Sequence, residues 1–350
     1  MLSLDQLIEK ARAMRASDVH IVCGLPAKCR VDGNVTDLTG EVLTAADCEM
    51  LARELAGAEY ETMADIGELD MARSFPDGGR TRVNLFRQQG SVSAAIRLLA
   101  DHIPSLDELS LPPVVADFAS YRSGIVLVTG ETGSGKSTTL ACMLDRMNHK
   151  RTGHILTMED PIEFVHKHGS CIITQREIPT DIANYSEALR SAMRESPDVI
   201  LLGEMREAET IGTAINAAEM TQLVLSTLHT TSAADTIERM IDAFPASQQR
   251  QIRTQLSLVL QATVSQMLIP ALDGTTIPAF EVMHMNTAIR NLIREGKTPQ
   301  IESFITLSGR NGSITMDQAL RQLVQQGTVA FDTAVAYARD REAFQNAHSF

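Results

Sequence analysis

Gly124-Ile-Val-Leu-Val-Thr-Gly-Glu-Thr-Gly-Ser-Gly-Lys-Ser-Thr-Thr-Leu140 places a strand, a glycine-rich loop and a helix start in immediate succession. Residues 125–128 are an apolar, largely β-branched run of the kind that is buried on both faces of a parallel sheet. The next residues, Gly130-x-x-x-x-Gly135-Lys136-Ser137, are the full Walker A motif, whose backbone N–H groups converge on a phosphate beside the positive end of a helix. We expect Lys136 to reach the β- and γ-phosphates and the Ser137 hydroxyl to bind Mg²⁺. The stretch therefore predicts a nucleotide-binding α/β domain.

The composition is that of an ordinary globular protein with room for two domains. The chain has 350 residues, of which 44% are hydrophobic and 21% are charged. The formal net charge of −13 opposes tight binding to a nucleic-acid backbone, because that binding depends on Lys and Arg. We therefore expect no nucleic-acid partner.

The sequence carries no signal for insertion into a membrane. Its first residues have helical spacing without the apolar core of a signal peptide, and no apolar run approaches the ~18–20 residues that span a bilayer. The five cysteines are an odd number and form no C-x-x-C pair, so reduced thiols are expected rather than a zinc site or a disulfide framework. These features predict a cytosolic protein.

Residues 1–100 mix short strands and helices, which predicts an α+β domain without catalytic spacing of its own. Four arginines cluster late in this domain: Arg80, Arg82, Arg87 and Arg97. They could reach phosphates across an interface, or they could form a solvated strand face with surface ion pairs. Prolines then mark residues 101–115 as an interdomain linker. We place the nucleotide-binding core at residues 116–270 and a C-terminal part with a helical tail at residues 271–350.

Polar side chains follow three more predicted strands of the core. The run 154–159 leads into Glu159-Asp160-Pro-Ile-Glu163, the run 199–202 into Gly203-Glu204, and the run 222–229 ends in His229. The carboxyl ends of parallel strands face the ligand crevice. The first acids can hold metal-bound water or accept a proton from it, or they solvate a loop. Glu204 has the position of a Walker B acid, and His229 is either structural or a sensor of the γ-phosphate.

Two helices are expected in the C-terminal half. Apolar side chains on one stripe predict a long helix over residues 246–269. A second helix over residues 286–296 has a cap, a glycine terminator and two arginines, Arg290 and Arg294, on one face. We expect these two arginines to remain available to a partner or a neighbouring domain.

Together these residues resemble the secretion ATPase superfamily of type II secretion, type IV pili and archaella, over nearly the whole chain. Four motifs carry the resemblance: Walker A at Gly130–Ser137, an Asp box at Thr157–Glu163, Walker B at Val199–Glu204, and a His box that ends in Leu228-His229-Thr230. The helix Ala288-Ile-Arg-Asn-Leu-Ile-Arg-Glu295 is similar to the one associated with the retraction motors of type IV pili. The resemblance implies an α/β fold: a RecA-like P-loop ATPase core, a PAS-like α+β N-terminal domain and a helical C-terminal tail.

The resemblance also implies a homohexameric ring that hydrolyses ATP and powers pilus retraction. The ring would lie at the pilus base, on the inner face of the membrane, and would meet an inner-membrane platform protein. The implied nucleotide-binding residues are Gly130, Thr132, Gly133, Ser134, Gly135, Lys136, Ser137 and Thr138, with Arg82 and Arg97 from the N-terminal domain. Ser137, Glu204 and Glu159 would hold Mg²⁺. Glu163 would activate the attacking water, and His229 would sense the nucleotide.

One position departs from the family pattern. Thr221-Gln222 stands where Gly-His is usual, so one of two box histidines is missing and we expect altered coupling of the γ-phosphate to domain motion, with slower hydrolysis. Two alternatives stay open: another secretion ATPase, for pilus extension or for type II or type IV secretion, and a slow or non-hydrolysing NTP-binding regulator. The helix 288–295 argues against the first, and Glu163 with Glu204 argues against the second.

Overall fold

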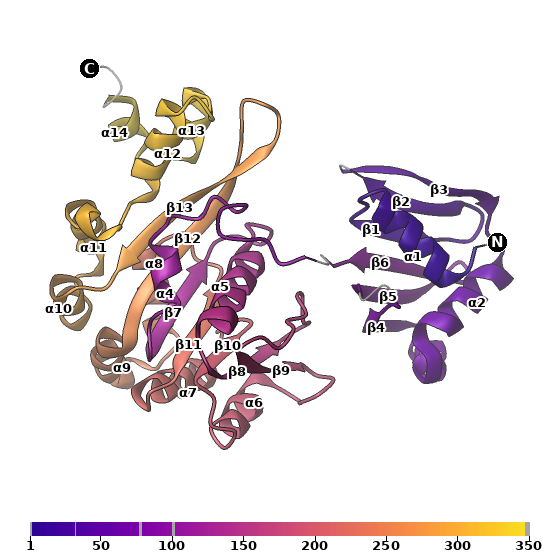
Figure 1. Cartoon of the computed structure of the whole chain (residues 1–350), viewed down its shortest axis with the longest axis horizontal. Helices are drawn as coiled ribbons and strands as arrows, with labels where there is room; N and C mark the ends of the chain where they lie inside the picture. The colour runs from indigo at the N-terminus through magenta and orange to yellow at the C-terminus, as the bar shows by residue number, and fades with distance from the viewer. Residues whose placement is uncertain (1, 32, 77–78, 100–101, 347–350) are drawn as a thin grey trace. The chain divides into compact units, whose positions relative to one another are not determined.

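The structure is a computed structural model that describes residues 2–31, 33–76, 79–99 and 102–346 (Figure 1). The chain divides into two units near His102, and the short segment Glu163–Val165 groups with the N-terminal unit. Asp101, the first residue of the predicted linker, lies outside the described residues. Among the helices of the described ranges, none is long and apolar enough to cross a membrane.

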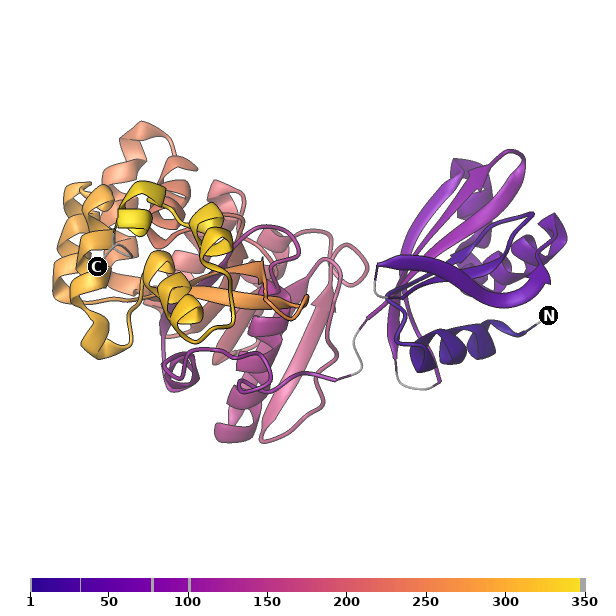
Figure 2. The ribbon, with the colours of Figure 1, turned by 90° about the horizontal axis from the view of Figure 1, so that it is seen from above.

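The N-terminal unit is a six-stranded antiparallel sheet with helices on one face. Its strands are β1 (Asp18–Ile21), β2 (Pro26–Val31), β3 (Asn34–Val42), β4 (Glu68–Ser74), β5 (Arg80–Gln88) and β6 (Ser91–Leu98), in the order β3-β2-β1-β6-β5-β4. Its helices are α1 (Leu4–Ala13), α2 (Ala45–Ala56) and α3 (Tyr60–Ile66). Burial alternates along β1 and β5, because one face of each strand packs on helices while the other is left open. Figure 2 shows α1 running along the covered side.

The C-terminal unit is built on a seven-stranded sheet that is parallel except at one edge. Its strands are β7 (Gly124–Thr129), β8 (Gly153–Glu159), β9 (Cys171–Glu177), β10 (Val199–Leu202), β11 (Leu223–Leu228), β12 (Leu260–Pro270) and β13 (Thr276–His284). They lie in the order β13-β12-β7-β11-β10-β8-β9, and only β13 is antiparallel to its neighbour. The central strands β7, β10 and β11 are buried along their whole length, which explains their uninterrupted apolar sequence.

Helices cover both faces of this sheet, as in a doubly wound fold (Figure 1). One face carries α4 (Val115–Phe118) and α5 (Lys136–Lys150), and the other carries α6 (Tyr185–Ala192), α7 (Ala208–Glu219), α8 (Ala233–Asp242) and α9 (Ala246–Val259). The remaining helices are α10 (Thr287–Glu295), α11 (Ile301–Leu307), α12 (Met316–Gln325), α13 (Phe331–Tyr337) and α14 (Arg341–Asn346). The predicted fold class is confirmed, including the helical tail. Strand β13, although it lies within residues 271–350, belongs to the core sheet.

The long helix expected over residues 246–269 is wrong in its second half. Helix α9 ends at Val259, and residues 260–270 form β12 between β7 and β13. Five consecutive residues of β12 are buried, because the strand has sheet neighbours on both sides and helices on both faces. Such a run matches a helical stripe as well as a buried strand, so its periodicity alone cannot separate the two.

Candidate functional site

The carboxyl ends of four neighbouring parallel strands form the candidate site. Strand β7 leads into the phosphate loop, β11 ends before His229, β10 ends before Gly203-Glu204, and β8 ends in Glu159. Since these strands lie in the order β7-β11-β10-β8, His229 stands between the phosphate loop and Glu204 along this edge. The sheet thus gathers residues that are far apart in sequence.

The phosphate loop requires its glycines. Gly130, Gly133 and Gly135 all have positive φ, which disfavours any side chain with a Cβ. A Cβ on Gly130 would also lie 2.2 Å from the carbonyl oxygen of Gln266 and 2.6 Å from Ser134 Oγ. The loop therefore packs directly against β12 and has no room for a larger residue at its start.

Lys136 points back into this loop. Its Nζ donates to the carbonyl oxygens of Gly130 and Glu131, each at 2.8 Å, and the residue is 8% exposed. The ammonium is thus held inside the loop, where a bound phosphate would meet it. The other predicted loop residues line the same turn: Thr132 and Gly133 are exposed, Ser137 and Thr138 are half-buried at the start of α5, and Ser134 is buried.

Gln266 is a residue of the site that the sequence analysis missed. Its amide is 4% exposed in the middle of β12, where it donates through Nε2 to the carbonyl of Ser134 and accepts at Oε1 from Thr139 Oγ1 at 2.8 Å. One side chain thereby ties the phosphate loop to the first turn of α5. A buried amide inside an apolar run is the signal that could have pointed to it, had the run been assigned to a strand.

Glu204 and His229 face each other across the neighbouring ends of β10 and β11. Glu204 Oε2 lies 3.5 Å from His229 Nε2 and 2.8 Å from the guanidinium of Arg206. His229 is 45% exposed at its side chain and Glu204 is 26% exposed, so both can meet a ligand. A base and an acid in contact beside a phosphate loop suit the detection of a phosphate group.

The Asp box supplies two acids in different surroundings. Glu159 accepts a hydrogen bond from Thr157 Oγ1 at 2.7 Å and a longer one from Gln175 Nε2 at 3.4 Å, which restrain its direction. Glu163 is exposed in the loop after β8. Within the described ranges, no group of three or more His, Cys, Asp or Glu side chains forms a metal cage.

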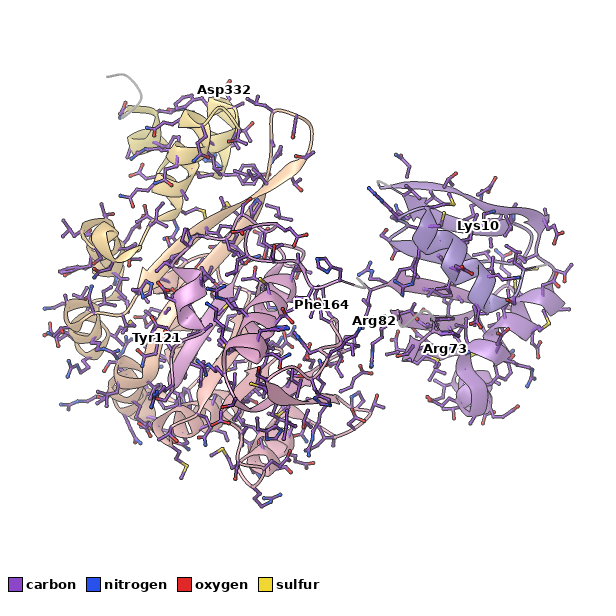
Figure 3. All side chains as sticks on the ribbon, in the orientation of Figure 1. Lys10, Arg73, Arg82, Tyr121, Phe164 and Asp332 are labelled. Atoms are coloured by element: carbon purple, nitrogen blue, oxygen red, sulfur yellow. The ribbon has the colours of Figure 1, made fainter. Side chains whose placement is uncertain are left out.

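Arg82 and Arg97 stand side by side on the N-terminal sheet. They are directly opposite each other on β5 and β6, and both are exposed (Arg82 is labelled in Figure 3). Arg97 pairs with Asp18 at 3.1 Å, whereas Arg82 forms no ion pair with another described residue. Like charges directly opposite are unfavourable unless an anion lies nearby.

The expected effect of Gln222 on the coupling of the γ-phosphate to domain motion and on hydrolysis stays a prediction. Gln222 precedes the first residue of β11, whereas His229 follows its last residue. At ~3.3 Å per strand residue the two are about 20 Å apart, at opposite ends of β11. Gln222 therefore has no direct access to a nucleotide on the phosphate loop.

Arg290, contrary to the expectation, is not available to a partner. Its Nη1 donates to the carbonyls of Ser257 and Leu258, the latter at 2.8 Å, so it caps the carboxyl end of α9. Its Nη2 donates to Gln261 Oε1 at 3.3 Å, just inside β12. Arg294 is exposed, and its hydrogen bonds to described residues go to Arg290 and Asn291 of its own helix. The two arginines share a helix but have different roles.

Comparison with known proteins agrees with this geometry. The family described as "Type II/IV secretion system protein" matches residues 2–347. The chain belongs to this family. It is 42% identical to the type IV pilus retraction ATPase PilT of Pseudomonas aeruginosa, over 98% of this chain and 100% of that protein. It is 36% identical to the type IV pilus ATPase PilU of the same organism, over 96% of this chain and 89% of that protein.

A solved structure gives the same result. The crystal structure of the pilus retraction motor PilT with bound ADP superposes with a TM-score of 0.93 at 41% identity, covering 99% of this chain and all of that one. The resemblance inferred from the sequence is thereby confirmed, and with it the assignment of the chain as a nucleotide-binding ATPase of this family.

Proposed function

We propose that this chain is an ATP-hydrolysing motor that powers type IV pilus retraction. The observation that carries the proposal is the order of groups along one sheet edge: the phosphate loop with its buried lysine, then His229 in contact with Glu204, then Glu159. The close similarity to PilT over the full length supports retraction as the output.

Each group has a proposed task at the nucleotide. The loop N–H groups and Lys136 bind the phosphates, and Ser137, Glu204 and Glu159 offer the oxygen atoms that Mg²⁺ prefers. When bound, Mg²⁺ would neutralise charge on the β- and γ-phosphates. Glu163 accepts the proton of the attacking water, and His229 donates a hydrogen bond to the γ-phosphate and transmits its presence to Glu204.

We propose that the active form is a homohexamer in the cytoplasm that meets an inner-membrane platform protein. The domain limits that we propose are 1–100, 101–115, 116–270 and 271–350. In the ring, Arg82 and Arg97 would reach a nucleotide; their adjacent, exposed guanidiniums support a role in binding an anion. The similarity to PilU keeps another pilus ATPase as the alternative.

Two substitutions separate binding from hydrolysis. Glu163→Gln keeps the phosphate loop and removes the base, so nucleotide affinity should hold while turnover falls by ~10²–10⁴-fold. Lys136→Ala removes the ammonium and should weaken ATP binding itself. Phosphate release and fluorescent-nucleotide titration measure the two effects. Turnover within twofold of wild type in Glu163→Gln would show that another group is the base.

A further inference from the structure

Tyr185 places a phenol hydroxyl beside the Walker B acid. It is the first residue of α6, whose start is fixed by Asn184 Oδ1 accepting from the backbone N–H of Glu187 at 2.9 Å. The ring packs against the core on this face of the sheet. A Cβ on Gly203 would lie 2.7 Å from the Tyr185 hydroxyl oxygen, so the hydroxyl rests directly on the residue before Glu204.

Gly203 follows β10 and is hydrogen-bonded to the ends of the neighbouring strands β8 and β11. Its N–H donates to the carbonyl of Met158 at 2.8 Å, and its carbonyl accepts from Thr227 Oγ1 at 2.6 Å. Its φ is not positive, so its backbone conformation does not demand glycine. What demands glycine is the space occupied by the Tyr185 hydroxyl. The Tyr185 hydroxyl therefore lies where the carboxyl ends of β8 and β10 meet. Strand β8 ends in Glu159, and Glu204 follows shortly after β10.

The described residues around the Tyr185 hydroxyl leave it free to donate to a carboxylate. It forms no hydrogen bond with another described residue, although the strand ends around it are acidic. Burial raises the pKa of the Tyr185 phenol, and the nearby carboxylates of Glu204, Asp160 and Glu159 raise it further. The hydroxyl keeps its proton at neutral pH, as an ordinary tyrosine does, and can donate it to one of these acids.

We propose that Tyr185 is a positioning residue for Glu204: its hydroxyl donates a hydrogen bond to the Glu204 carboxylate once that carboxylate turns from Arg206 toward a bound Mg–nucleotide. This rests on the proposed function of the same site. Tyr185 touches neither the nucleotide nor the water; it fixes the direction of the acid that supports the cation. A hydrogen bond to a charged group is strong enough for its loss to be measured.

Tyr185→Phe tests this most simply, because it removes one oxygen atom and keeps the ring. ADP affinity without Mg²⁺ should stay within twofold of wild type, whereas the Mg²⁺ concentration for half-maximal nucleotide binding should rise by about tenfold, with a similar fall in kcat. Tyr337→Phe, on the exposed side of α13, is the matched control and should change neither value. An unchanged Mg²⁺ requirement overturns the proposal, and a loss of Mg²⁺-free ADP binding overturns it in favour of a purely structural role.

A second pair of variants tests the geometry through stability alone. Gly203→Ala should lower the melting temperature, because its methyl group meets the Tyr185 oxygen. In a Tyr185→Phe background that oxygen is gone and the penalty should shrink, since the next nearest atoms are 3.4 and 3.5 Å away. Equal penalties in the two backgrounds contradict the placement of the hydroxyl. Nucleotide binding by the wild-type protein that does not depend on Mg²⁺ would instead contradict the proposed function. Failure of the Tyr185 proposal and failure of the proposed function therefore give different results.

Discussion

Two buried polar side chains on neighbouring strands form hydrogen bonds on opposite faces of the same sheet. Gln266 on β12 holds the phosphate loop on the α5 side, while Glu281 on β13 holds the starts of two helices on the other side. Glu281 is 1% exposed and accepts from the backbone N–H groups of Ala233, the first residue of α8, at 2.8 Å, and Met316, the first residue of α12, at 3.4 Å.

The difference follows from what each side chain must satisfy. The phosphate loop offers a carbonyl acceptor at Ser134 and α5 offers a hydroxyl donor at Thr139, so a neutral amide with one donor and one acceptor end fits both. Helix starts offer N–H donors, so a carboxyl group, which has two oxygen atoms that can accept, fits them. A negative charge in place of Gln266 would also repel the phosphates that the loop must bind. Each strand thus carries the side chain whose donors and acceptors match the groups it faces.

Exchanging the amide for an acid should have the largest effect. Gln266→Glu turns the donor to the Ser134 carbonyl into an acceptor and buries a charge without a partner, which costs about 3–5 kcal/mol of stability. Nucleotide affinity should fall at least tenfold as well, because the charge faces the phosphates. Equilibrium unfolding and nucleotide titration at alkaline pH measure both. Gln248→Glu, exposed on α9, is the control, and affinity equal to wild type in Gln266→Glu would remove the role given to this amide.

Exchanging the acid Glu281 for an amide should have a smaller effect on stability. Glu281→Gln keeps one acceptor but sets an NH₂ group against a backbone N–H, which costs about 1–3 kcal/mol. Chemical denaturation at acidic pH measures the loss. Because the Glu281 side chain lies on the face of the sheet opposite to Gln266, nucleotide affinity should be unchanged. A stability equal to wild type would mean that one of the two helix starts is held by other groups.

The pH dependence of this pair has a defined sign. Burial raises the pKa of Glu281 above its ordinary value near 4.5, an effect larger than the opposing effect of the two N–H groups. The folded protein then keeps this proton at a pH where the unfolded chain has lost it. The stability contributed by Glu281 is therefore full below about 4.5 and falls as pH rises through the raised pKa. The stability gap between wild type and Glu281→Gln should narrow with rising pH, and a widening gap would contradict the raised pKa.

Arg290 acts on the far end of the strand that carries Gln266. Arg290→Ala removes the cap on α9 just before β12 begins and should cost about 1–2 kcal/mol. Arg294→Ala, on the same helix, should change stability by less than about 0.5 kcal/mol. Thermal unfolding compares the two. Arg294→Ala is therefore the cleaner probe of a partner: it should keep ATPase activity and impair twitching in cells, and full motility would show that Arg294 contacts no partner needed for retraction.

The sequence predicted the site residues that lie within one stretch of chain or directly follow a buried strand. It did not predict the residue that reaches the site from a neighbouring strand. The phosphate loop lies within one stretch of chain, and Glu159, Glu204 and His229 each follow their own buried strand. Gln266, by contrast, meets Ser134 across 132 positions of sequence, because β12 lies beside β7. Because residues 260–269 were predicted to be helical, the position of Gln266 beside the phosphate loop was not predicted.

Phosphate release from ATP, measured together with the mass of the assembly in the same sample, is the most direct measurement of this proposed ATPase motor. Wild type should release phosphate only with Mg²⁺ and should form a hexamer in Mg-ATP. Lys136→Ala should lose phosphate release, and Glu163→Gln should bind ATP and assemble but release phosphate at least a hundredfold more slowly. Wild-type protein that binds ATP without releasing phosphate, or equal release by Lys136→Ala, would contradict an ATPase motor that acts through this phosphate loop.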